Sequence, residues 1–274
     1  MLKLKAFVSI AALICFSNVL NAADFSKADA LFAKRDEGRA ATQAARDAYR
    51  AIVDQGAKDT DLVRAVEGLA RSYLYEASAL LRSDVPEEKV QKKKLFNECW
   101  NSIVETISPS KLGYSSPIYW YLRASSMAQE AEISTSFERL TNLPKLNEAF
   151  EKGLASSGGD TYEGGGIKRV KAAVKGNPEA KGLPGGLYNP LEALKIVDEA
   201  IASEAYPGQV EGFLFCENFR RKINILNTLE RTSEAKSLAD STVSDFGNYL
   251  SEGLIPEFIR AETLHCLKQV SLQK

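Results

Sequence analysis

The chain has 274 residues, of which 45% are hydrophobic and 26% are charged, and its formal net charge is -1. These values are typical of a globular protein and exclude a collagen-like, a disulfide-dense or a wholly disordered chain. The near-neutral charge argues against a dedicated nucleic-acid binder, and the single histidine removes many catalytic schemes.

The first 22 residues have the pattern of a secretory signal peptide. Lys3 and Lys5 precede an apolar run at 6–16, and a small residue closes the pattern at Ala22. We expect cleavage after Ala22, which leaves a mildly acidic mature chain at 23–274. No later segment has the roughly 20 apolar residues that a membrane span needs, so we predict a soluble, periplasmic protein.

The four cysteines predict little covalent chemistry. Cys15 lacks the small residue that a lipoprotein signal places directly before its cysteine, so membrane anchoring by a lipid is not expected. The expected mature chain contains three cysteines, Cys99, Cys216 and Cys266, in a compartment where disulfides form. Three cysteines can form at most one intrachain disulfide. Their apolar helical contexts favour buried thiols, and whether two of them pair stays open. The lack of a CxxC pair excludes zinc ribbons and thioredoxin-like redox chemistry.

Helical periodicity runs through almost all of the chain outside 153–190. Apolar side chains between Leu62 and Leu81 form a stripe that is broad enough to pack on more than one neighbouring helix. Proline and capping residues mark further helix starts at Asp84-Val85-Pro86, Ser116-Pro117 and Asn189-Pro190. The pattern predicts an all-α protein.

A weak internal repeat predicts antiparallel helical hairpins. Apolar or small residues at i, i+4, i+7 and i+8 recur about every 50 residues, starting from Ala45, Phe96, Leu146 and Ala193. The stripe between Leu62 and Leu81 fits the first helix of a tetratricopeptide (TPR) hairpin in part, although the spacing exceeds the TPR unit of about 34 residues. We therefore predict one domain at 23–274, an array of degenerate TPR-like hairpins. An unrelated helical bundle is the alternative.

A glycine-rich segment at 153–190 interrupts this pattern and contains ten of the 18 glycines. We expect a long loop, which is unusual in a compact helical domain unless it is functional or disordered. A nucleotide site does not fit, because the Rossmann pattern needs a glycine at Arg169. Either the backbone approaches a ligand or partner, with Tyr162, Arg169 and Tyr188 at the rim, or the glycines only supply turns with positive φ.

Three elements of the sequence together carry a family resemblance. They are Ala28-Asp29-Ala30-Leu31-Phe32-Ala33-Lys34-Arg35, Tyr162 with Gly164-Gly165-Gly166-Ile167-Lys168-Arg169, and Pro184-Gly185-Gly186 followed by a helix at 189–205. In order and spacing they resemble the periplasmic T-component proteins of tripartite ATP-independent periplasmic (TRAP) transporters. The resemblance implies a TPR-like, oligomeric protein that accompanies the transporter's solute-binding subunit and helps to hand it a ligand.

The resemblance also implies roles for individual residues. It assigns loop shape and rim contacts, rather than chemistry, to Tyr162, Gly165, Gly166, Arg169, Pro184, Gly185 and Gly186. The lipid-attachment cysteine that is common in these proteins is missing, so the resemblance does not extend to membrane anchoring.

The sequence offers few groups for catalysis. His265 and Cys266 are adjacent in a predicted helix, so their side chains point about 100° apart and do not form a dyad. No spacing predicts a metal site, and we expect no cofactor. A hydrolase of cell-wall or polysaccharide material stays open, because paired carboxylates are defined in space. The local candidates for such a pair are Glu87-Glu88 and Glu130-Ala131-Glu132.

The leading hypothesis is a non-enzymatic protein that binds a partner or a small hydrophobic solute in a concave or central cavity. Tyr119, Trp120 and Tyr121 are candidate lining residues, because three consecutive helix positions rarely all face a core; filling the seams between hairpins is the alternative. The expected partners are the solute-binding subunit of a transporter and further copies of the chain, and no nucleic acid. A structural envelope adaptor without a ligand-sized pocket is a further alternative.

Overall fold

The structure is a computed structural model that describes residues 23–106, 117–185 and 187–273. Within these ranges the protein is all-α, as predicted, with eleven α-helices and no strand. Their bounds are α1 Ser26–Ala33, α2 Arg39–Asp54, α3 Asp59–Tyr75, α4 Pro86–Thr106, α6 Pro117–Ile133, α7 Ser136–Ala155, α8 Tyr162–Gly176, α9 Pro190–Ile201, α10 Cys216–Thr228, α11 Thr232–Ser251 and α12 Glu257–Ser271. The predicted signal peptide at 1–22 and the predicted site residue Gly186 lie outside the described residues.

Several helix starts confirm the predictions made from proline and capping residues. Helices α4, α6 and α9 begin at Pro86, Pro117 and Pro190. At α9 the side chain of Asn189 accepts a hydrogen bond of 3.1 Å from the backbone N–H of Glu192, which satisfies one of the unpaired donors of the first turn. None of the described helices is both long and apolar enough to cross a membrane.

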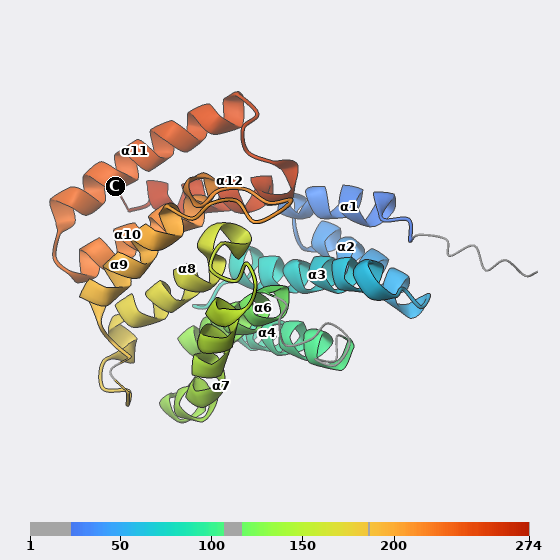
Figure 1. Cartoon of the computed structure of the whole chain (residues 1–274), viewed down its shortest axis with the longest axis horizontal. Helices are drawn as coiled ribbons and strands as arrows, with labels where there is room; N and C mark the ends of the chain where they lie inside the picture. The colour runs from blue at the N-terminus through green and yellow to red at the C-terminus, as the bar shows by residue number, and fades with distance from the viewer. Residues whose placement is uncertain (1–22, 107–116, 186, 274) are drawn as a thin grey trace, which may run out of the picture.

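The helices form a curved array that closes on itself (Figure 1). Consecutive helices pack together along the chain, as expected of helical hairpins, and α1 at one end contacts α12 at the other. The closing contact is made by Arg35, which is fully buried just after α1. Its guanidinium group donates hydrogen bonds to the carboxylate of Glu262 and, at 2.7 Å, to the carbonyl oxygen of Phe258. The inner faces of the helices therefore surround a central space.

Two hydrophobic clusters hold most of the array together. The larger cluster joins α1 to α4 with α6, α7 and the middle of α8, and Trp120 is fully buried within it. The predicted stripe on α3 faces this cluster, with Val66, Leu69 and Tyr73 all buried. The smaller cluster joins α10, α11 and α12 around Phe246. The C-terminal hairpins thus have a core of their own.

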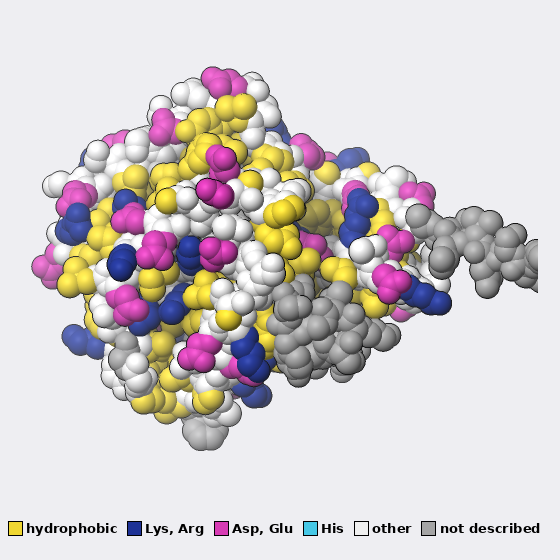
Figure 2. All heavy atoms as spheres, viewed as in Figure 1, with side chains coloured by type: hydrophobic (Ala, Val, Ile, Leu, Met, Phe, Trp, Pro, Cys, Tyr) yellow, Lys and Arg dark blue, Asp and Glu magenta, His cyan; other side chains and the backbone are white. Residues whose placement is uncertain are grey.

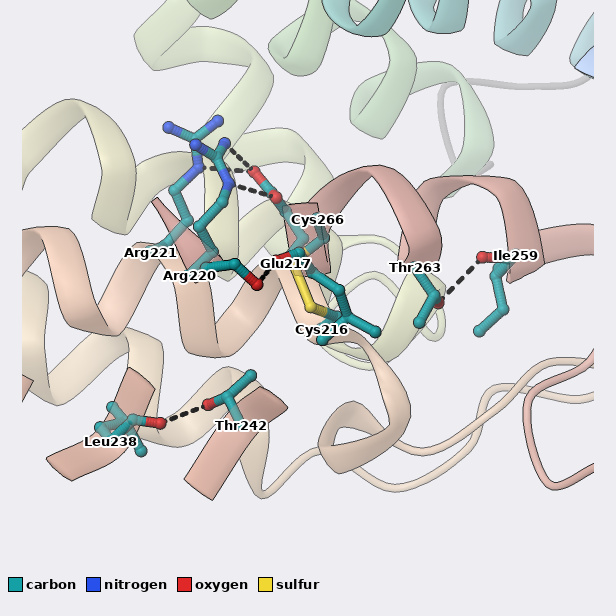
Figure 3. The surroundings of a disulfide bond; sticks show 11 residues. Cys216, Glu217, Arg220, Arg221, Leu238, Thr242, Ile259, Thr263 and Cys266 are labelled. Atoms are coloured by element: carbon teal, nitrogen blue, oxygen red, sulfur yellow. Dashed lines mark hydrogen bonds and ion pairs between the residues drawn. A yellow bond between two sulfur atoms is a disulfide. The ribbon is translucent and has the colours of Figure 1, made fainter. Parts of the chain in front are cut away.

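A disulfide bond between Cys216 and Cys266 ties α10 to α12 (Figure 3). This pairing answers the question that the sequence left open. Cys99 is a free thiol, fully buried in the larger cluster, and burial raises its pKa well above the usual range. The thiol of Cys99 is therefore expected to behave as an inert core group.

Removing the disulfide should lower the free energy of unfolding by about 4 kcal/mol, because it closes a loop of about 50 residues in the unfolded chain. Cys216→Ala and Cys266→Ala should each cause this loss, and the double variant should lose little more, since one bond is removed in all three. Urea unfolding followed by circular dichroism measures the loss. Cys99→Ala is the matched control and should remain sensitive to dithiothreitol. A native protein whose unfolding midpoint is unchanged by dithiothreitol would contradict the prediction.

The glycine-rich segment is not the single long loop that the sequence led us to expect. Helix α8 occupies Tyr162–Gly176 and divides the segment into connections at 156–161 and 177–189, the second of which contains the 3₁₀ turn Pro178–Ala180. Glycine is a poor helix former, which is why composition favoured a loop. The start of the helix is unusual, since Glu163, Gly164 and Gly165 have positive φ values of 55°, 54° and 75°. Only glycine adopts this region readily, so these glycines shape a left-handed turn before the regular helix.

Candidate ligand-binding cavity

The central space contains a cavity of about 580 Å³. Its wall is built from α3, α4, α6, α7, α8, α10, α12 and the π-helix Glu76–Leu80 that extends α3. This volume falls within the range of pockets that hold small molecules. On the face of the molecule in Figure 2, charged side chains of both signs are interspersed with apolar ones, without a large patch of one sign. Because of its volume, the cavity is the candidate ligand-binding site of this fold.

One part of the cavity wall is apolar. It is formed by Leu143 of α7 and by the residues that pack against it from the segment after α8, among them Ala180, Leu183 and Leu187. The later turns of α8 continue this surface through Val170, Ala173 and Val174. An apolar group of a ligand would be removed from water on this part of the wall.

A second part of the wall is charged (Figure 3). On α10, the carboxylate of Glu217 accepts hydrogen bonds of 2.7 Å from Nε of Arg220 and 2.9 Å from Nε of Arg221. Burial alone would raise the pKa of Glu217, but the charges of Arg220, Arg221 and Arg169 hold it far below its usual range. The carboxylate therefore stays ionised, and the two neighbouring guanidinium groups share it.

The start of α8 carries a buried polar network at the edge of the cavity. The hydroxyl of Tyr162 donates a 2.6 Å hydrogen bond to Glu67 of α3, and burial together with this carboxylate raises the pKa of Tyr162 well above its usual range. Glu163 forms an ion pair with Arg71, and its backbone N–H donates to the side chain of Gln209 at 2.5 Å. These contacts hold the left-handed turn in place and tie α8 to α3.

The second described cavity, also of about 580 Å³, lies on the other side of this network. Tyr162 and Glu67 line it, and Arg71 lines both cavities. Its wall comes from α1, α2, α3, α6, the start of α8, the first turn of α12 and the connection that contains Gln209. The polar network is thus the partition between the two spaces.

Two glycines of the predicted site serve close packing. A Cβ atom on Gly165 would lie 2.7 Å from the Cα atom of Ala200 in α9. A Cβ atom on Gly166 would lie 2.6 Å from the ring of Tyr121. Both distances are shorter than a real side chain tolerates, so these positions let α8 approach its neighbours without a gap.

The structure brings five predicted site residues together around the first turns of α8: Tyr121, Tyr162, Gly165, Gly166 and Arg169. The Tyr121 ring lies 5.6 Å from the Tyr162 ring, measured between centroids, and its hydroxyl accepts a 3.4 Å hydrogen bond from Arg169. Tyr121 and Arg169 line the first cavity, and Tyr162 lines the second. This group is a wall of buried and half-buried residues rather than the rim of a loop.

The other predicted site residues lie elsewhere. Tyr119 and Trp120 are 5% and 0% exposed, pack in the larger hydrophobic cluster and line neither described cavity. Pro184 and Gly185 are exposed in the connection between α8 and α9, and Tyr188 packs beside the Leu143 cluster. The predicted aromatic group is therefore divided, with Tyr121 alone facing the cavity.

Sequence reasoning missed most of the charged wall. Glu217, Arg220 and Arg221 are spaced three and four residues apart, a common pattern for ion pairs on a helix surface. Nothing in that spacing distinguishes a solvent-facing row from one that faces an internal cavity. The position of Arg71 in the cavity wall could not be predicted either, because its partner Glu163 is 92 positions away in the sequence.

Of the carboxylates considered for hydrolysis, Glu87 and Glu88 line neither described cavity, and Glu130 and Glu132 do not form an isolated acidic pair. Glu130 is half-buried and accepts a 3.2 Å hydrogen bond from Asn97, while Glu132 lies at the cavity, 3.7 Å from Arg221. Burial raises the pKa of Glu130 and lowers that of His265, a cavity residue of α12. Among the described residues, no group of three or more His, Cys, Asp or Glu side chains could hold a metal ion.

Comparisons of this chain with protein-family models, with curated proteins and with solved structures found no match.

Proposed function

We propose that this protein is a periplasmic TPR-like accessory protein of a TRAP-type transporter, which holds a small, mainly hydrophobic solute in its central cavity and presents it to the transporter's solute-binding subunit. The observation that carries the proposal is the ligand-sized cavity inside the closed array. Arg169, the last residue of the Gly164 to Arg169 element on which the family resemblance depends in part, lines this cavity.

The charged wall favours solute binding over hydrolysis. A glycosidase needs one carboxylic acid whose pKa is raised, so that it donates a proton to the leaving group. Glu217 has a lowered pKa and accepts hydrogen bonds from two arginines, and Glu163 is paired with Arg71. Burial raises the pKa of Glu130, but Glu130 lines neither described cavity. The cavity also favours solute binding over the structural adaptor, because the adaptor hypothesis expects no ligand-sized pocket.

Filling the cavity should abolish solute binding. Ala173 lies on α8 with its side chain in the cavity wall, so Ala173→Phe places a ring in the ligand's space. When the full chain is expressed in a periplasm, native mass spectrometry of the wild type should show one discrete bound molecule that is released on denaturation. The Ala173→Phe protein should lack this molecule.

The matched control is Ala40→Phe, an exposed alanine of α2 that lines neither described cavity. This variant should retain the ligand, and circular dichroism should show both variants folded. A wild-type protein without a bound molecule would contradict the solute-binding part of the proposal. Full retention of the ligand by a folded Ala173→Phe variant would show that the ligand binds outside this cavity.

The transporter part of the proposal needs a separate test. The purified solute-binding subunit of a TRAP transporter from the same source should form a complex with the protein in analytical ultracentrifugation. An unrelated periplasmic binding protein is the control. A protein that retains its solute but forms no complex with any TRAP solute-binding subunit would contradict the transporter assignment and leave solute binding in place.

A further inference from the structure

The charged wall contains a buried cation, Arg169, that has no carboxylate within ion-pair distance among the residues that the structure describes. Arg169 is 5% exposed and is one of the residues that line the cavity. It donates 3.0 Å hydrogen bonds to the backbone carbonyl of Glu163 and to Oδ1 of Asn218, and a longer one to the hydroxyl of Tyr121. All three acceptors are neutral. A buried charge is costly unless an opposite charge compensates it, so this position suits an anion supplied by a ligand.

The neighbouring side chains leave this part of the wall with a surplus of positive charge. Arg220 and Arg221 share the carboxylate of Glu217, which is also close enough to Arg169 to interact with its charge. Glu132 adds a second carboxylate, but only at 3.7 Å from Arg221. Glu163 belongs to another pair, since its carboxylate binds Arg71 and Gln209. Three guanidinium groups therefore face two carboxylates here.

The apolar wall begins next to this charged group. Val170 directly follows Arg169, and Ala173 and Val174 lie one turn further along the same helix. A molecule that lies along α8 would therefore meet the guanidinium groups at one end and the Leu143 cluster at the other. Such a cavity suits a ligand with one charged end and one apolar end.

We infer that the solute is an anionic amphiphile, with a carboxylate head that binds Arg169, Arg220 and Arg221 and an apolar tail that lies along Val170, Ala173 and Val174. This inference rests on the proposed function and names the chemical class of its solute. Guanidinium groups bind carboxylates through paired N–H donors, which gives the head a defined place. The tail is removed from water on the apolar wall.

Three probes with the same ten-carbon chain test the inference on the wild-type protein: decanoate, decan-1-ol and decylammonium. Isothermal titration calorimetry at low ionic strength should show decanoate binding at least about tenfold more tightly than the alcohol, and decylammonium binding most weakly. Equal affinities for decanoate and the alcohol, or no binding of decanoate, would overturn the inference. Because this comparison uses one folded protein, it does not depend on a variant that folds.

A matched pair of variants locates the head group. Arg220→Gln should weaken decanoate binding at least about fivefold and leave the affinity for decan-1-ol unchanged. Arg231→Gln removes a similar ion pair, formed with Glu234 at the exposed start of α11, and should alter neither affinity. An unchanged decanoate affinity in a folded Arg220→Gln protein would overturn the assignment of this head-group site.

The result is distinguishable from a failure of the proposed function. Binding of decan-1-ol without any preference for decanoate rejects the anionic head and leaves a solute-binding cavity in place. A discrete bound ligand without an acidic group, identified by native mass spectrometry, would also reject the anionic head and leave the solute-binding cavity in place. Absence of any retained solute, together with no binding of the three probes, rejects both proposals.

Discussion

Replacing Gly165 with alanine should lower the free energy of unfolding by about 3 kcal/mol or more. Its φ of 75° lies in the left-handed region, which costs other residues about 1 to 3 kcal/mol. The added Cβ would also lie 2.7 Å from both the Cα atom of Ala200 and the hydroxyl oxygen of Ser203. Because α8 and α9 would have to move apart, a further loss of about 1 to 3 kcal/mol is expected from overpacking. Urea unfolding followed by circular dichroism measures the sum.

Gly185→Ala is the matched control for the Gly165 substitution. Gly185 has a similar φ of 81°, but a Cβ atom there would have no neighbour within 4 Å. Its replacement should therefore cost only the conformational part, about 1 to 2 kcal/mol. The difference between the two variants measures how tightly α8 packs on α9. Equal losses would show that the close approach contributes nothing to stability.

Replacing Trp120 with alanine should lower the free energy of unfolding by about 4 kcal/mol, because Trp120 is fully buried in the larger hydrophobic cluster and its removal leaves a cavity. For a chain of this size the loss corresponds to a fall in Tm of about 10 °C. Differential scanning calorimetry measures the shift, and native mass spectrometry at a temperature where the variant is folded should show the bound solute unchanged.

The control for the Trp120 substitution is Leu191→Ala on α9, where the side chain is 70% exposed. Its loss should stay within about 0.5 kcal/mol. A Trp120→Ala protein with an unchanged Tm and no bound solute would contradict the prediction. It would indicate that Trp120 contacts the solute.

The helices themselves were predictable because their signals are local. The apolar stripe from Leu62 to Leu81 predicts which face of α3 is buried. Pro86, Pro117 and Pro190 indicate helix starts, because proline has a fixed φ and no N–H. Such patterns depend on residues within one or two turns of each other. They predict an all-α hairpin array without any knowledge of how the hairpins meet.

The candidate site was predictable only in part, because its geometry depends on distant residues. The resemblance pointed to the Gly164 to Arg169 element, yet the glycines there shape a left-handed helix start instead of a loop. The contact between Tyr162 and Glu67 joins positions 95 residues apart. The charged wall arises because Glu217 and its arginines turn inward, and helical spacing does not reveal which neighbours cover a given face.

The contact between α1 and α12 changes how the molecule is expected to open. In an open helical array each unit touches only its neighbours, so terminal units fray independently of one another. Here the buried Arg35 is held by Phe258 and Glu262, 223 and 227 positions further along the chain. Loss of either terminal helix removes part of the support of the other, so local unfolding at the two ends is coupled.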